Sequence, residues 1–207
     1  MIQIPENLKK VCKDNTIKAL AMFDNTEVPS KISFDEYQNF YQAKVFLQKF
    51  KTDGWIMCRQ IWEAVWENLV NDLDIENHNI TYITDLDNCF DLANDISDYS
   101  TFIASYEINK KFKINLSIML YWQNKQLGIF SSITNQDGDN FAITQETSKL
   151  IAVQNCEYGT YNESQYTVSL NNSDTISDED IRHFKQFAQE IINYFNQHQQ
   201  EVLSNLK

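Results

Sequence analysis

Four aspartates with a regular spacing are the most unusual chemical feature of the sequence. In the segment DLDNCFDLANDISD, a helix would stack on one side Asp87, Asp91, Asp95 and Asp98. Like charges at this spacing destabilise an isolated helix by roughly 0.2–0.5 kcal/mol per pair. A row of carboxylates complements a Lys/Arg patch, so we predict that these residues bind a basic protein partner. The alternatives are a solvated face and a contribution to a cation site.

A second acidic segment, residues 135–146 (NQDGDNFAITQE), resembles the calcium loop of the EF-hand over twelve residues. The loop positions that supply oxygen ligands are occupied by Asn135, Asp137, Asp139 and Glu146. However, Asn140 stands where a glycine makes the sharp turn, and the flanking residues have the pattern of strands. We therefore predict a hairpin turn at Asp137 and Gly138, with calcium binding as the alternative.

The histidines and cysteines do not have the spacing of a zinc site or a disulfide framework. Asp180 and His183 share the i, i+3 spacing of helical metal pairs, but no second pair of that kind accompanies them. The four cysteines are isolated in the sequence: Cys12, Cys58, Cys89 and Cys156. We expect buried free thiols and no metal site, with a nucleophilic thiol as the alternative.

The sequence also lacks the motifs of the common nucleotide and hydrolytic enzymes. Its four glycines are scattered singly, so neither a phosphate-binding loop nor a nucleophile elbow can be assembled. Glu107 and Lys110 come closest to a nuclease pair, but strand alternation puts them on opposite faces. The enzymatic alternative that stays open is a metal-dependent hydrolase whose carboxylates, such as Glu107, Asp137 and Asp139, converge from separate elements.

The net charge of the chain indicates which classes of macromolecule it can bind. Seventeen Lys and Arg residues stand against 29 Asp and Glu, which gives a net charge of −12. Nucleic acid and anionic membranes would be repelled, whereas a basic protein would be attracted. No apolar run reaches membrane-spanning length, and the start of the chain lacks the pattern of a signal peptide, so we predict a cytoplasmic protein. The scarcity of Arg is typical of AT-rich bacterial or phage genomes.

The first half of the chain has helical periodicity. Helices are predicted over 5–23 and 33–50, the second with a capping box at Ser33 and Glu36. One broad apolar stripe of that helix comprises Phe34, Tyr37, Phe40, Tyr41, Leu47 and Phe50. Gly54 is expected to separate it from a third helix, whose tryptophans form its apolar face: Trp55, Trp62 and Trp66. We predict that this face is core, with a partner or oligomer interface as the alternative.

The second half has the alternation of strands. Strands are predicted over 80–84, 100–108, 111–122, 126–133 and 164–170, with a helix over 85–96 between the first two. Hairpin connections at 109–111 and 123–125 indicate an antiparallel meander. A final helix is predicted over 181–206, after an acidic segment that suits a helix N-terminus.

These patterns predict one α+β domain over residues 1–207, with a candidate seam near residues 76–84. In it, an N-terminal helical half packs with an antiparallel β-meander and a long C-terminal helix. We predict an acidic protein-interaction module rather than an enzyme, without a cofactor. It would act as an inhibitor or antidote that binds a basic surface of a nuclease, toxin or nucleic-acid-binding complex, and would not itself bind nucleic acid.

Overall fold

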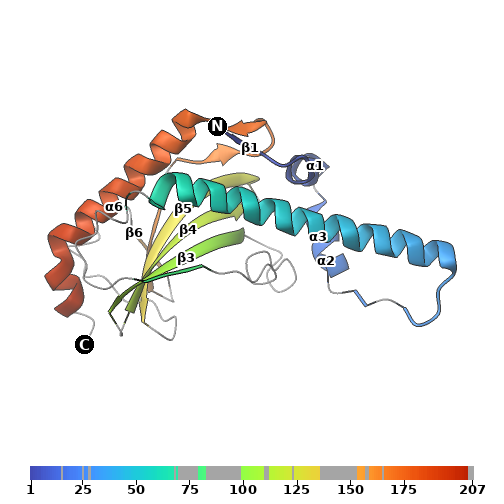
Figure 1. Ribbon diagram of the computed structural model, residues 1–207, viewed down its shortest axis with the longest axis horizontal. Coiled ribbons are helices and arrows are strands. Elements are labelled where there is room, and N and C mark those ends of the chain that lie inside the picture. Colours follow the sequence, from blue (N-terminus) through green and yellow to red (C-terminus); the bar gives the residue numbers. More distant parts are fainter. Residues whose placement is uncertain are drawn as a thin grey trace.

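The chain folds into helices and an antiparallel sheet, which confirms the predicted α+β class (Figure 1). The computed structural model describes residues 1–67, 69, 79–82, 99–109, 112–135, 153–156 and 159–204, apart from positions 15, 25, 28, 123 and 165. The larger sheet has the strand order β2-β3-β4-β5-β7-β6, and β8 also pairs with β5. The strands are β2 (Asn79–Tyr82), β3 (Tyr99–Asn109), β4 (Phe112–Tyr121), β5 (Gln126–Asn135), β6 (Val153–Cys156), β7 (Gly159–Glu163) and β8 (Val168–Ser169).

The centre of this sheet is a meander built on the two predicted hairpins. In the register of the strands, Phe102 of β3 lies opposite Ile118 of β4, and Ile118 lies opposite Ile129 of β5. At the β4–β5 turn, Lys125 adopts a φ of 54°, a left-handed conformation that tight turns require. The antiparallel connections therefore follow from short turns, as the sequence predicts.

The edge beyond β5 differs from the prediction. The hairpin of β6 and β7 was not predicted, and the predicted strand over 164–170 is reduced to the two residues of β8. Ser164 interrupts that strand: its backbone N donates to the carbonyl oxygen of Ile129 (2.9 Å), and its Oγ donates to the carbonyl oxygen of Tyr166 (2.8 Å). A side chain that bonds the neighbouring backbone turns the chain away from a regular ladder.

The longest helix is continuous where the sequence predicts two. Helix α3 (Phe34–Trp62) begins at the predicted capping box, in which Ser33 Oγ accepts from the backbone N of Glu36 (3.3 Å). It then runs through Gly54 and continues as one π-helical turn, η1 (Glu63–Glu67). The expected break was wrong because Gly54 is buried, and tertiary packing outweighs a helix penalty of about 1 kcal/mol.

Near the N-terminus, the structure has two helices where the sequence predicts one helix over 5–23. These are α1 (Glu6–Asp14) and α2 (Ile17–Asp24). Thr16 separates them: its N donates to the carbonyl oxygen of Val11 (3.3 Å), and its own carbonyl oxygen accepts from Leu20 N (3.0 Å). The chain thus ends one helix and starts the next within a few residues, which lets α2 turn along α3.

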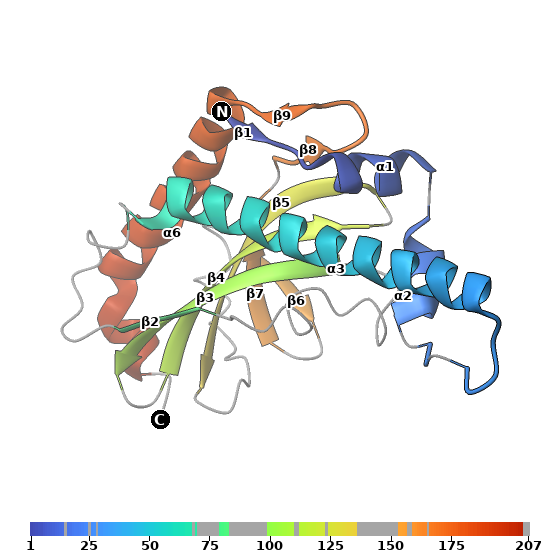
Figure 2. The same cartoon turned by 45° about the vertical axis from the view of Figure 1, so that its right-hand side comes forward.

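The core lies where the C-terminal half of α3 crosses the sheet (Figures 1 and 2). Trp62 and Trp66 are fully buried, and Trp62 Nε1 donates to the carbonyl oxygen of Leu116 in β4 (3.2 Å). Burial confirms the core interpretation of these two tryptophans and excludes them as a partner surface. Residues 116–120 of β4 are buried on both faces of the strand, because Ser117 is as inaccessible as Leu116.

The last helix, α6 (Asp178–Ser204), packs against η1. Its buried stripe comprises Phe184, Ala188, Ile191 and Ile192. A two-stranded sheet joins the chain's beginning to the segment before α6, because β1 (Ile2–Gln3) pairs with β9 (Thr175–Ile176). No helix in the described part of the chain is both long enough and apolar enough to cross a membrane.

Candidate protein interface

The N-terminal half of α3 extends beyond the sheet as an arm (Figure 1). We define the α3 arm as residues 34–46, none of which is buried; the first buried residue of the helix is Leu47. An amphipathic helix in a globular protein normally buries a stripe along its length. The α3 arm therefore depends on local contacts for its position.

The inner side of the α3 arm is held by α2. The rings of Phe23 and Phe40 lie 5.0 Å apart, centroid to centroid. Lys44 Nζ donates to the carbonyl oxygen of Phe23 (3.1 Å) and stands 4.9 Å from the centroid of the Phe23 ring. A cation close to an aromatic face is attracted by the ring quadrupole, so this lysine joins the two helices.

The outer side of the α3 arm carries an apolar stripe that is open to solvent. The outer stripe consists of Phe34, Tyr37, Tyr41 and Val45. Phe34 is 72% exposed and Tyr41 is 60% exposed. The spacing of three and four residues places all four side chains on one face of the helix. Ile56, also exposed, continues the same face three turns further along α3.

The predicted single stripe on this helix was therefore wrong. Leu47 and Phe50 are buried, but Phe34, Tyr37 and Tyr41 point to the other side of the helix. The signal for this was present in the sequence, because apolar residues occupy more of the circumference than one buried stripe needs. Sequence patterning alone does not show which of two apolar faces meets the core.

Charges of both signs flank the outer stripe, with acidic residues at its start and the lysines Lys31 and Lys44 on either side. Between residues 32 and 43 the chain carries Asp35 and Glu36 but no Lys or Arg. Backbone and side-chain hydrogen bonds from Ser33 lower the pKa of Glu36, so this carboxylate keeps its charge to low pH. The arm thus combines aromatic surface with negative charge at its tip.

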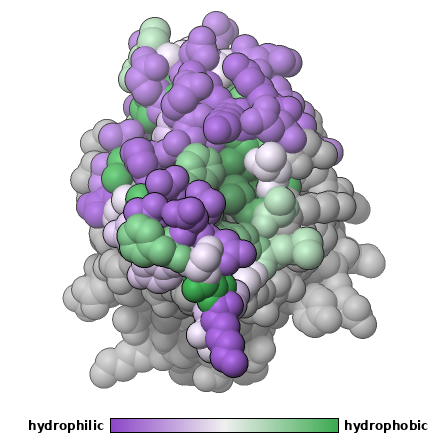
Figure 3. All heavy atoms as spheres, turned by 90° about the vertical axis from the view of Figure 1, so that its right-hand side faces the viewer, coloured by the Kyte–Doolittle hydropathy of each residue, from purple (hydrophilic) through white to green (hydrophobic). Residues whose placement is uncertain are grey.

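Figure 3 views the end of the molecule that carries α1, α2 and the start of α3. Hydrophobic side chains gather in the middle of this face, with hydrophilic residues above them and to their left. Exposed apolar patches with a polar rim are typical of protein interaction sites. Aromatic residues are also enriched at such interfaces, which fits the composition of the outer stripe.

The predicted site residues lie outside the described part of the chain. This holds for the four aspartates at 87, 91, 95 and 98, for the predicted helix 85–96, and for 136–146 of the calcium-like segment. Glu107 is placed in β3 opposite Lys113 of β4, but only its backbone is described. The aspartate stripe, the calcium loop and the converging carboxylates therefore stay predictions.

Asp180 and His183 contact residues at the start of α6 and in the segment before it. Ser177 Oγ and Ser177 N both donate to Asp180 Oδ2 (2.7 Å each), which caps the start of α6. Tyr166 Oη donates to Asp180 Oδ1 (2.6 Å), and the Tyr166 ring stacks on His183 at 4.3 Å. Asp180 is thus occupied by hydrogen bonds rather than directed at a cation.

These contacts shift the pKa of Tyr166 and the pKa of Asp180. The hydrogen bond to Asp180, assisted by burial, raises the pKa of Tyr166 to about 12. Burial alone would raise the pKa of Asp180, but the hydrogen bonds from Tyr166 and Ser177 outweigh it and lower the pKa.

Two described cysteines are buried free thiols. Cys12 and Cys58 are buried, and burial raises the pKa of Cys12 to about 11, so its thiol stays protonated. Within the described ranges, no three His, Cys, Asp or Glu side chains form a group that could hold a metal ion. Comparison of the chain with protein-family models, curated proteins and solved structures gives no significant match.

Proposed function

We propose that this protein is an acidic protein-interaction module that binds a basic partner through the outer stripe of the α3 arm. The observation that carries the proposal is a long helix whose exposed side is aromatic where a surface helix is normally polar. Burying a large aromatic side chain in a partner's pocket is the usual source of binding energy at interfaces. Phe34, Tyr37 and Tyr41 are the expected anchors.

The charge of the partner follows from the charge of the chain. A net charge of −12 attracts basic proteins over a distance and repels nucleic acid. Asp35 and Glu36 place negative charge next to the aromatic anchors. The partner is thus expected to have an apolar groove with Lys or Arg at its rim. The four aspartates at 87, 91, 95 and 98 are proposed as a further acidic contact, and inhibition of a nuclease or toxin as the biological role.

The test is affinity enrichment from an extract of the source organism at two salt concentrations, with proteins quantified by mass spectrometry. Three forms of the chain are compared: wild type, the double variant Phe34→Ser/Tyr41→Ser, and a control variant, Lys185→Gln, on the exposed side of α6. We expect one basic protein on wild type and control, reduced at high salt and lost with the double variant. Equal enrichment on all three forms would show that the α3 arm is not the binding site.

The aspartate stripe is tested separately by substituting Asp87, Asp91, Asp95 and Asp98 with asparagine. Removal of four negative charges is expected to slow association with a basic partner most at low salt. If binding at low salt does not change, these residues make no contact, and the proposal rests on the α3 arm alone.

A further inference from the structure

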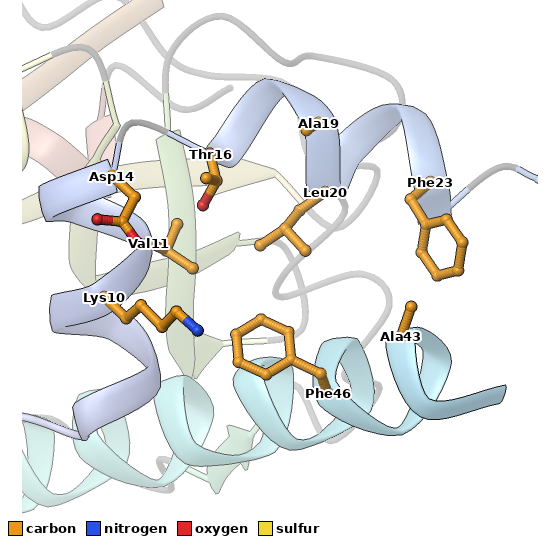
Figure 4. A pocket seen from close by; sticks show the side chains of 9 residues that line it. All are labelled: Lys10, Val11, Asp14, Thr16, Ala19, Leu20, Phe23, Ala43 and Phe46. Atoms are coloured by element: carbon orange, nitrogen blue, oxygen red, sulfur yellow. The ribbon is translucent and has the colours of Figure 1, made fainter. Parts of the chain in front are cut away.

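A cavity of about 480 Å³ lies between α1, α2 and the α3 arm (Figure 4). Its walls are mainly apolar and come from all three helices, with Val11 on α1, Leu20 and Phe23 on α2, and Phe46 on α3. This volume falls in the range of small-molecule sites, about 300–1,000 Å³. The cavity opens on the inner side of the arm, opposite the outer stripe, so a ligand here would not compete for the surface proposed to bind a protein.

The polar groups of the cavity gather at its α1 end. Lys10 Nζ points into the space and stands 5.9 Å from the centroid of the Phe46 ring. The hydroxyl of Thr16 points into the same space (Figure 4). Within the described residues Lys10 has no ion-pair partner, although Asp14 lies one helical turn away on the same rim. The cavity therefore has an ammonium, a hydroxyl and the Asp14 carboxylate at its α1 end and hydrocarbon at the other.

We propose that this cavity binds a small amphipathic anion, in particular a medium-chain carboxylate. Its hydrocarbon chain would lie against Leu20, Phe23 and Phe46, where it leaves water. Its carboxylate would accept hydrogen bonds from the Lys10 ammonium and the Thr16 hydroxyl. A cationic head group would be repelled by Lys10 at this end, and Lys44 adds a second positive charge beside the Phe23 ring.

Lys10 and Asp14 on α1 carry opposite charges, so substituting each should change octanoate binding in opposite directions. Binding of octanoate and of octylammonium to the whole chain is measured by isothermal titration calorimetry. Octanoate is expected to bind more tightly than octylammonium. Lys10→Gln is expected to weaken octanoate binding about two- to fivefold, the fold-change of an exposed ion pair, while Asp14→Asn tightens it because a nearby negative charge is removed.

Two further variants test the location. Leu20→Trp fills the cavity from α2 and Ala43→Leu narrows it from α3; the first is expected to abolish octanoate binding and the second to weaken it. A thermal unfolding curve for each variant shows that it is folded, and Lys31→Gln, at an exposed lysine outside the cavity, is the control. Preference for octylammonium, or weaker octanoate binding in Asp14→Asn, would overturn the anionic head group. Unchanged binding in both cavity variants, or no octanoate binding at all, would overturn the site.

Discussion

Helices α3 and α6 are the two long helices of the described chain, and their solvent-exposed faces differ in residue type. Helix α6 buries Phe184, Ala188, Ile191 and Ile192. Among the side chains of α6 that the structure describes, the exposed ones are all hydrophilic: Asp178, Glu179, Arg182, Lys185, Gln186, Glu190, Asn193, Asn196 and Gln197. Helix α3 buries Phe50, Met57 and Ile61 on one side but exposes Phe34 and Tyr41 on the other. The same protein thus builds one ordinary surface helix and one with two apolar faces.

Most of the large hydrophobic side chains that are exposed in the described part of the chain lie on α3; the others are Met1, Met22 and Tyr166. If the chain simply tolerated exposed aromatic residues, the described part of α6 would carry some as well. Their concentration on α3 therefore favours a specific use of that helix. Each of the following substitutions compares a position on one helix with a matched position on the other.

The largest effect is expected from the buried faces, which should be equivalent in the two helices. Phe184→Ala in α6 and Trp62→Ala in α3 each remove a fully buried aromatic side chain and should lower the free energy of unfolding by about 3–5 kcal/mol. Urea denaturation followed by circular dichroism measures this loss. Lys185→Ala, beside Phe184 but exposed, is the control; a comparable loss there would show that α6 is unusually sensitive to any change.

A smaller effect on stability is expected from substitutions at the helix caps. Here the loss of global stability should differ between the two helices. Ser177→Ala removes the Oγ that accepts from Asp180 N (3.1 Å) and should cost about 1 kcal/mol of global stability, because α6 is packed along the core. Ser33→Ala removes the corresponding cap from the α3 arm, which contains no fully buried residue, so we expect local fraying with little global loss.

Hydrogen exchange distinguishes the two kinds of loss at the caps. Amides in the first turn of α3 should exchange faster in Ser33→Ala, while the core amides of β4 keep their protection. An equal drop in global stability for both cap variants would contradict the view of the arm as a locally stabilised element.

A still smaller, pH-dependent effect is expected from Asp180 at the start of α6. Its pKa is lower in the folded protein than in the unfolded chain, so its contribution to stability is complete above the unfolded value of about 3.9 and is lost as the pH falls through the folded value. Asp180→Asn should therefore flatten the dependence of stability on pH below about pH 4. Denaturation midpoints measured from pH 7 to pH 2 for both proteins check this, and parallel curves would refute it.

The smallest effect on stability is expected from the outer stripe. Tyr41→Ser and Phe34→Ser remove large side chains that are already in water, so the free energy of unfolding should change by no more than about 0.5 kcal/mol. The denaturation experiment used for the core variants gives this value directly. A loss of 2 kcal/mol or more would mean that the stripe is covered in the folded chain, and the contrast with α6 would disappear.

Much of the fold follows from local patterns in the sequence. The alternation of Leu116, Ile118 and Leu120 locates β4, and the short polar links at 109–111 and 123–125 fix an antiparallel meander. The capping box of Ser33 and Glu36 marks the start of α3. These features succeed because backbone hydrogen bonding and side-chain alternation act over only a few residues.

The errors have other causes, some in contacts between distant parts of the chain and some in hydrogen bonds of single residues. Gly54 does not break α3, since packing against the body compensates for its weak helix propensity. The break at Thr16 and the short β8 arise from hydrogen bonds of single residues. The candidate interface was missed because periodicity identifies apolar faces but does not show which one meets the core; only the position of the sheet decides that.

The pairing of β1 with β9 also bears on when the protein can fold during synthesis. Ile2 lies opposite Ile176, Lys9 pairs with Asp174 (2.9 Å), and the amino group of Met1 pairs with Asp178 (2.6 Å). The first strand therefore has no partner until more than 170 further residues have been made, about 10–35 s at typical rates of translation. During that interval the amino-terminal segment lacks the strand and the two acidic partners that hold it in the folded protein. The carboxyl-terminal part of the chain thus sets the moment at which the amino-terminal part becomes native.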